Sequence, residues 1–144
     1  MLAAADLGMN VTCLRPAGWS LDPEIVAAAR ARAEAGGGSL VETDDQAAAY
    51  EGAHVVCAKA WGGLDWYGRF DAEAAAKAPL RADWIVDEPK LARTADAFFL
   101  HCLPVRRGVV VADGVLDSNR SGVIDEAENR LWTAAAAFAE LLGA

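Results

Sequence analysis

The sequence has little of what a disulfide framework, a metal site or a membrane span requires. It holds three cysteines (Cys13, Cys57 and Cys102) and two histidines, with no Cys-x-x-Cys pair. Widely spaced cysteines in odd number are typical of reduced thiols, so we expect neither disulfides nor a bound metal. No apolar run approaches the roughly 20 residues that cross a bilayer. Residues 1–8 lack the basic start and long apolar core of a secretory signal, and we therefore expect a cytoplasmic chain without a membrane partner.

Basic charge is also scarce. The chain carries 13 Lys and Arg against 21 Asp and Glu, a net charge of −8, which argues against nucleic acid as a partner. The 13 glycines do not form a phosphate-binding loop. Residues 36–38 end a predicted helix instead of opening one, so neither the P-loop nor the dinucleotide fingerprint is met. A nucleotide-binding α/β module is accordingly the weakest functional alternative.

What the chain does contain is an alternation of strand-like and helix-like segments. Apolar strand patterns occupy residues 9–14, 39–42, 54–58, 97–100 and 122–124. Between them, helix starts are predicted at Asp22-Pro23, at Asp44 or Asp45, at 87–89 and at 113–116, and a capping box of Asp125 and Glu128 is predicted to open the final helix. This alternation predicts an α/β domain with a parallel sheet covered by helices on both faces. The length of 144 residues suits one domain with a core.

Polar side chains follow three of the predicted strands. Lys59 follows 54–58, Cys102 follows 97–100, and Arg130 lies in the first turns after 122–124. Strands of a parallel sheet end at one edge, where ligands of open α/β sheets bind. We therefore expect a pocket for an anionic substrate, with a thiol near its reacting end and a helix N-terminus beside it. The alternative is a buried Cys and His that close a strand, which composition alone favours.

Two motifs resemble one enzyme family. His101-Cys102-Leu103-Pro104 is similar to the His-Cys-Leu-Pro signature of the ornithine carbamoyltransferases, and residues 125–131, Asp-Glu-Ala-Glu-Asn-Arg-Leu, resemble the last-helix motif of the same family. The resemblance extends weakly over essentially the whole chain. Residues 105–107 (Val-Arg-Arg) and 58–62 (Ala-Lys-Ala-Trp-Gly) resemble most closely the branch that acts on N-acetylornithine in arginine biosynthesis. The resemblance implies transfer of a carbamoyl group from carbamoyl phosphate to the side-chain amine of that substrate, without a cofactor.

The resemblance also implies roles for the substrate-binding residues. Lys59 would pair with the α-carboxylate of the substrate, whereas ordinary ornithine enzymes carry an Asp here for the free α-ammonium. An acylated amine has lost that charge, so a Lys suits the acylated substrate. Trp61 and Arg106 would help to bind it.

The catalytic roles follow from the same resemblance. His101 and Arg130 would polarise the carbamoyl oxygen as it gains charge. Cys102 would lie beside the attacking amine, and the carbonyl groups of Cys102 and Leu103 would hold the carbamoyl NH2. The Leu103–Pro104 peptide is expected to be cis.

The resemblance is partial, because the Ser-Thr-Arg-Thr loop that grips carbamoyl phosphate in the family is missing. It implies that residues 1–144 are a single, N-terminally incomplete amino-acid-binding domain that lacks its first strand, and that the carbamoyl-phosphate-binding domain is absent. We expect a chain inactive alone, an uncovered apolar side on the final helix, and a family-like homotrimer whose contacts lie mostly in the missing domain. The alternatives are a non-catalytic remnant or stand-alone amino-acid-binding module, and an ordinary ornithine carbamoyltransferase.

Overall fold

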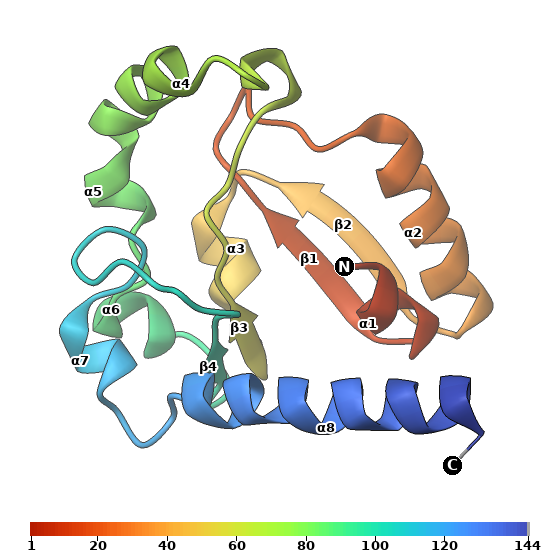
Figure 1. Ribbon diagram of the computed structural model, residues 1–144. Coiled ribbons are helices and arrows are strands. Elements are labelled where there is room, and N and C mark those ends of the chain that lie inside the picture. Colours follow the sequence, from red (N-terminus) through yellow and green to blue (C-terminus); the bar gives the residue numbers. More distant parts are fainter. Residues whose placement is uncertain (144) are drawn as a thin grey trace. The chain divides into compact units, whose positions relative to one another are not determined.

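The computed structural model describes residues 1–143, which divide into two compact units (Figure 1). The first unit comprises residues 1–51 and 61–84, and the second comprises residues 52–60 and the chain from 85 onward. Each unit contains one pair of parallel strands with helices around it. The α/β class with parallel pairing is therefore confirmed, and the described strands pair in twos.

The first unit is built around strands β1 and β2. Its elements are α1 (Leu2–Asp6), β1 (Asn10–Leu14), α2 (Pro23–Ala35), β2 (Ser39–Thr43), α3 (Gln46–Tyr50), the 3-10 turns η1 (Leu64–Trp66) and η2 (Ala78–Leu80), α4 (Phe70–Lys77) and α5 (Arg81–Trp84). The strands pair in parallel, from Asn10 opposite Ser39 to Leu14 opposite Thr43. Helices α1 and α2 pack on them through a buried cluster of Ala5, Val26, Ala29, Ala33 and Leu40.

Local sequence explains where α2 begins and ends. The Asp22 carboxylate accepts hydrogen bonds from the backbone N–H groups of Glu24 and Ile25, and Pro23 occupies the first helical position. Both features satisfy or remove backbone donors that a helix start leaves without partners. The helix ends at Ala35, and Gly36 is its C-cap. The predicted start at Asp22-Pro23 is thus confirmed.

The second unit is built around strands β3 and β4. Its elements are β3 (Val55–Cys57), α6 (Glu88–Leu91), β4 (Phe98–Leu100), α7 (Asp113–Leu116) and α8 (Val123–Leu142). The strands pair in parallel, with Val55 opposite Phe98 and Cys57 opposite Leu100. Phe99, in the middle of β4, is fully buried. Val111 and Val115, outside the strand, are among the other fully buried side chains. Successive residues of a strand face opposite sides, and its neighbour Phe98 is 59% exposed.

One predicted strand, residues 122–124, is wrong. The chain makes only a single parallel bridge to Phe99, at Ser121, and helix α8 then begins at Val123 with Gly122 as its N-cap. The capping box of Asp125 and Glu128 is wrong for the same reason, because both residues already lie inside the helix. A short apolar run is ambiguous between a strand and the buried face of a helix. Here backbone hydrogen bonds fix the helix start. The Gly122 N–H donates to the Phe99 carbonyl, and the Gly122 carbonyl accepts the first helical hydrogen bond, from the Glu126 N–H.

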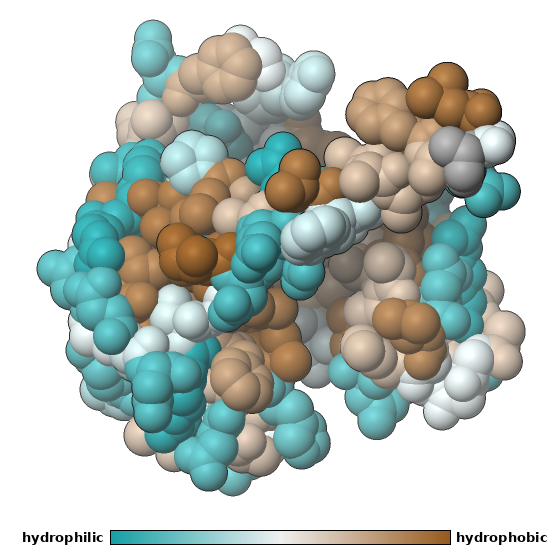
Figure 2. All heavy atoms as spheres, turned by 60° about the horizontal axis from the view of Figure 1, so that its bottom comes forward, coloured by the Kyte–Doolittle hydropathy of each residue, from teal (hydrophilic) through white to brown (hydrophobic). Residues whose placement is uncertain are grey.

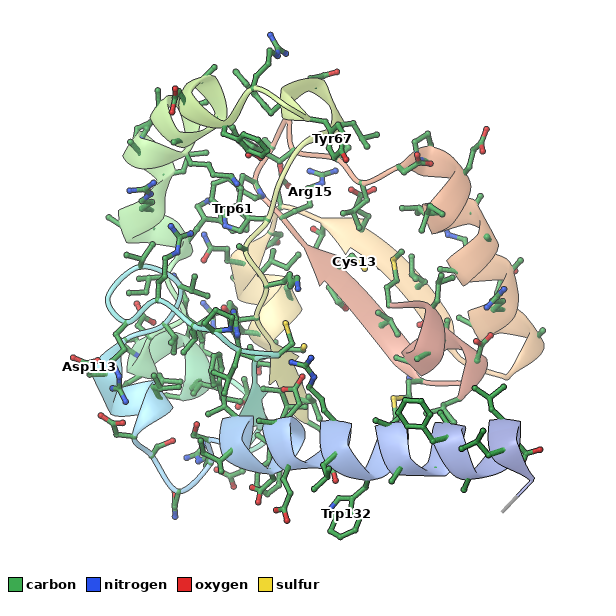
Figure 3. All side chains as sticks on the ribbon, viewed as in Figure 1. Cys13, Arg15, Trp61, Tyr67, Asp113 and Trp132 are labelled. Carbon is green, nitrogen blue, oxygen red and sulfur yellow. The ribbon has the colours of Figure 1, made fainter. Side chains whose placement is uncertain are left out.

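Helix α8 has an uncovered apolar side. Leu131 and Phe138 are each 64% exposed, and Leu142 is 78% exposed. Figure 2 shows apolar side chains gathered in surface patches between hydrophilic ones, and Trp132 projects outward from α8 (Figure 3). Among the described residues, no helix has the length and hydrophobicity to cross a membrane.

The opposite burial of two neighbouring phenylalanines gives a matched test of the β4 orientation. We expect Phe99→Ala to lower the free energy of unfolding by about 3–5 kcal/mol, because it empties a fully packed site. Phe98→Ala removes the same ring from an exposed position and is expected to lower it by less than about 1 kcal/mol. Denaturant unfolding of both variants measures the difference. Equal losses would contradict the assigned strand faces.

Candidate functional site

The candidate site lies where β3 and β4 end. Because the two strands run parallel with Cys57 opposite Leu100, the residues that follow them emerge at one edge. The pairing continues one step further, since the Ala58 N–H donates to the Leu100 carbonyl at 2.9 Å. Lys59 Nζ then donates to Cys102 Sγ at 3.1 Å. Two of the three strand-end residues that the sequence singled out are therefore in direct contact.

His101 is held in one orientation beside this contact. Its side chain is buried, with 5% of the residue exposed, and its Nδ1 accepts a hydrogen bond from the Leu103 N–H at 3.0 Å. A neutral imidazole that accepts at Nδ1 carries its proton on Nε2. Burial lowers the pKa of His101, the positive charge of Lys59 lowers it further, and Glu126 opposes both. His101 is thus a neutral ring that offers one N–H donor.

The turn after His101 presents free carbonyl groups. Leu103 adopts a left-handed backbone conformation with φ 47°, and the Leu103–Pro104 peptide is cis, as the sequence resemblance implied. A positive φ at a bulky residue is uncommon. Within residues 1–143, neither the Cys102 nor the Leu103 carbonyl accepts a hydrogen bond. Both oxygens are available to an N–H donor of a ligand.

The two neighbouring arginines differ in what they contact. Arg107 donates to Asp113 at 3.0 Å and binds both carboxylate oxygens of Asp117, at 2.6 and 2.8 Å. These hydrogen bonds lower the pKa of Asp117. Asp113, labelled in Figure 3, opens helix α7, so Arg107 ties the loop to that helix. The exposed Arg106 side chain makes no hydrogen bond or ion pair with any described residue, which leaves it available to a ligand.

Arg130 and Glu126 lie one turn apart on α8. Residues four positions apart share a helix face, so the exposed Arg130 side chain lies on the face that carries Glu126. The charge of Glu126 acts on both His101 and Cys57, so Glu126 itself lies near the candidate site. The structure thus brings Lys59 and Cys102 into contact, whereas Arg130 lies on α8 rather than at the end of a strand. The role of Arg130 in the site stays a prediction.

Glu126 is a residue that sequence reasoning missed. Its Oε2 atom is buried and accepts no hydrogen bond from the described part of the chain. The sequence pattern suggested only an acid near the helix start, which the helix dipole stabilises. An acid four residues before a candidate catalytic arginine was the available signal. Residues 1–143 contain no group of three or more His, Cys, Asp or Glu side chains that could hold a metal ion.

Trp61 belongs to the first unit. Its ring packs edge-on against Trp19 at a centroid distance of 4.8 Å and against Trp84 at 6.4 Å. Lys77 Nζ lies 5.3 Å from its centroid. The role of Trp61 in binding a substrate therefore stays a prediction, because these contacts account for its ring as part of an aromatic cluster.

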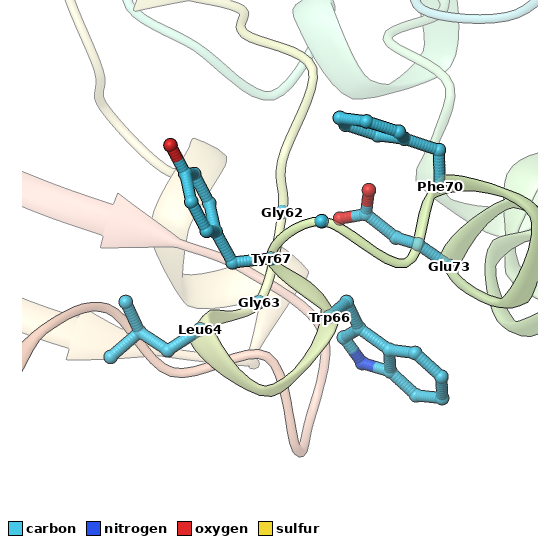
Figure 4. Close-up of a pocket in the computed structure, with 8 residues that line it drawn as sticks. Gly62, Gly63, Leu64, Trp66, Tyr67, Phe70 and Glu73 are labelled. Atoms are coloured by element: carbon cyan, nitrogen blue, oxygen red, sulfur yellow. The ribbon is translucent and has the colours of Figure 1, made fainter.

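A separate pocket of about 230 Å³ lies in the same unit (Figure 4). Its lining includes Trp66 and Tyr67, and Glu73 contributes a carboxylate. That carboxylate is already paired with Lys77 at 3.1 Å. The two aromatic residues thus line a pocket, but no catalytic side chain predicted from the sequence lines it.

Comparison with known proteins identifies relatives of the whole chain. The family model described as "Aspartate/ornithine carbamoyltransferase, Asp/Orn binding domain" matches residues 1–141. The chain is 42% identical over 144 residues to an N-acetylornithine carbamoyltransferase of Xanthomonas campestris pv. campestris, covering 97% of this chain and 41% of that protein. It is 37% identical over 145 residues to an ornithine carbamoyltransferase of Acidothermus cellulolyticus, covering 100% of this chain and 45% of that protein.

Solved structures of N-acetylornithine carbamoyltransferases are also similar to this chain. A crystal structure of acetylornithine transcarbamylase complexed with acetylcitrulline matches with a TM-score of 0.82 and 43% sequence identity, over 89% of this chain and 38% of that chain. Another, of an N-acetyl-L-ornithine transcarbamylase mutant, contains carbamyl phosphate and N-succinyl-L-norvaline and has the same TM-score and identity. The present chain spans less than half the length of each of these proteins.

The environment of His101 leads to a testable titration. We expect its ring to titrate below the ordinary pKa of 6.5, and Glu126→Gln to lower that pKa further, because Glu126 favours the charged ring. Because the pKa of His101 is lower in the folded than in the unfolded chain, the unfolded chain binds the imidazole proton more readily. The free energy of unfolding therefore falls as the pH drops below about 6.5. His101→Gln is expected to weaken this dependence. NMR titration and denaturant unfolding measure both effects, and a ring that titrates at or above 6.5 would contradict the assigned environment.

Proposed function

Because the chain belongs to the aspartate/ornithine carbamoyltransferase family, we propose that it is the amino-acid-binding part of an enzyme that carbamoylates N-acetylornithine. The side-chain amine of N-acetylornithine attacks the carbonyl carbon of carbamoyl phosphate, a tetrahedral intermediate forms, and phosphate leaves. The single observation that carries the choice of substrate is the contact between Lys59 and Cys102, because it sets a cation at the edge where the substrate binds.

Lys59 selects the acylated substrate by charge. Its ammonium donates to a sulfur, which is only a weak acceptor. A carboxylate is a far better partner, because its hydrogen bonds to an ammonium are charge-assisted. The α-carboxylate of N-acetylornithine therefore replaces the sulfur as the acceptor. Free ornithine also carries an α-ammonium, which Lys59 repels.

His101 supplies a donor for the carbamoyl oxygen. The ring accepts at Nδ1 and so carries its proton on Nε2, and this N–H donates to the oxygen as negative charge develops there. A fixed donor that is already neutral and oriented lowers the barrier without reorganisation. The free carbonyls of Cys102 and Leu103 accept from the carbamoyl NH2. The sulfur of Cys102 lies beside the attacking amine, and no covalent enzyme intermediate is involved.

The arginines complete the charge balance of the proposed site. Arg130 shares a helix face with Glu126, whose charge acts on His101, and it donates to the same developing oxyanion as His101. Arg106, without a partner among the described residues, binds the acylated substrate. Bringing the two substrates together in one geometry supplies much of the remaining acceleration. Residues 1–144 are, in this proposal, an N-terminally incomplete amino-acid-binding domain.

Carbamoyl phosphate requires a phosphate site that we place in another part of the enzyme. The curated relatives are more than twice as long as this chain, and we propose that the corresponding additional domain binds the phosphate group and makes most contacts of a trimer. In isolation the chain is then inactive. A cytoplasmic location and a place in arginine biosynthesis follow from the substrate and stay predictions.

A chimeric enzyme tests the proposed function. The chain replaces the matching segment of the Xanthomonas campestris N-acetylornithine carbamoyltransferase, and formation of N-acetylcitrulline and citrulline is measured. We expect the chimera to form N-acetylcitrulline with a higher kcat/KM than citrulline, and the isolated chain to form neither. A chimera with His101→Ala controls for background activity. Preference for ornithine, or product formation by the isolated chain, would contradict the proposal.

Lys59→Asp in the same chimera tests the charge argument. The substitution removes a charge-assisted hydrogen bond and sets a negative charge near the α-carboxylate, so we expect KM for N-acetylornithine to rise roughly 10- to 100-fold. Lys59→Arg keeps the charge and is expected to lose much less. Circular dichroism checks that both variants fold. An unchanged KM after Lys59→Asp would remove the argument for an acylated substrate.

A further inference from the structure

We infer that Lys59 and Cys102 form an oxidative modification site, in which peroxide converts their contact into a covalent nitrogen–sulfur bond. The two reacting atoms already touch, with Lys59 Nζ 3.1 Å from Cys102 Sγ. Cys102 is half-buried and Lys59 is exposed, so neither reacting group is sealed from a small oxidant. The inference rests on this contact alone and holds whether or not the chain binds an acylated amino acid.

The reaction proceeds in two balanced steps. Hydrogen peroxide first oxidises the Cys102 thiol to a sulfenic acid: an S–O bond forms, the O–O bond breaks, and one water is released. The Lys59 ammonium gives a proton to solvent, and its amine then attacks the sulfur. An N–S bond forms, the S–O bond breaks, and hydroxide leaves with the second nitrogen proton as water. The sulfur loses two electrons in total and the peroxide gains them.

Among the described residues, the other two thiols have no lysine in hydrogen-bond contact, unlike Cys102. Desolvation raises the pKa of both Cys13 and Cys57, and the charge of Glu126 raises that of Cys57 further, which disfavours their thiolate forms. Cys57 is, however, exposed. It is also close enough for Cys102 to influence its titration, so a Cys57–Cys102 disulfide is the competing product that the experiment has to distinguish.

Such a crosslink would reversibly prevent Lys59 from binding a carboxylate. It consumes the positive charge of Lys59 and the free thiol of Cys102 in one step. A nitrogen–sulfur bond of this kind is cleaved by thiols, since a thiolate attacks the sulfur and the amine leaves. The lysine in the strand-end position thus adds a redox response that an aspartate at the same position would not give.

Mass spectrometry of the 144-residue chain tests the inference. The chain is treated with equimolar hydrogen peroxide, its remaining thiols are alkylated, and intact mass and proteolytic peptides are measured. We expect a species that has lost the mass of two hydrogen atoms, has one alkylated thiol fewer, and yields a joined peptide containing Lys59 and Cys102. Dithiothreitol is expected to restore the original mass.

Four variants separate the crosslink from its competitors. The species should be lost in Lys59→Arg and in Cys102→Ser. It should persist in Cys57→Ser, and in Lys90→Arg, a matched lysine whose ammonium donates to the Ile85 carbonyl instead. Loss of the species in Cys57→Ser would identify a disulfide and overturn the inference. Persistence in Lys59→Arg, or a product that retains peroxide oxygen at Cys102 in the unmodified sequence, would also overturn it.

Discussion

The parallel pairing of β3 with β4 is the constraint on which the candidate site depends. Lys59 and Cys102 are 43 residues apart in the chain, yet their side chains touch, because Cys57 pairs with Leu100 and the strands end at one edge. Burial of Phe99 in the middle of β4 fixes which way that strand faces. A one-residue shift of register would turn every side chain of the strand to the other side and separate the pair.

The electrostatics of the site follow from this geometry. Burial and the lysine charge keep His101 neutral, whereas Glu126 pulls in the opposite direction. A neutral, oriented ring suits the proposed donor role better than an imidazolium, because it stays in the same state between turnovers. The different contacts of Arg106 and Arg107 also follow from the local geometry. Asp113 and Asp117 hold Arg107, and Arg106 is left for a ligand.

The Lys59–Cys102 contact serves both substrate selection and the oxidative crosslink. A sulfur is a poor hydrogen-bond acceptor, so the lysine is easily recruited by a carboxylate. A sulfur is also the most oxidisable atom in the site, so the same proximity favours a covalent bond when an oxidant is present. Substrate binding and oxidation thus use the same two atoms and exclude each other. A bound carboxylate takes the lysine ammonium away from the sulfur, and the crosslink consumes the charge that binds the carboxylate.

Local sequence determined the elements whose signals lie within a few residues. The start of α2 at Asp22-Pro23, helix α7 at 113–116 and the α/β alternation follow from caps, turns and periodicity, and the two motifs pointed to the family. Tertiary structure alone decided that residues 122–124 enter helix α8, that Asp113 and Asp117 hold Arg107, and that a Glu126 oxygen is buried. These outcomes depend on which distant backbone and side-chain groups meet in space, and no pattern of neighbouring residues contains that information.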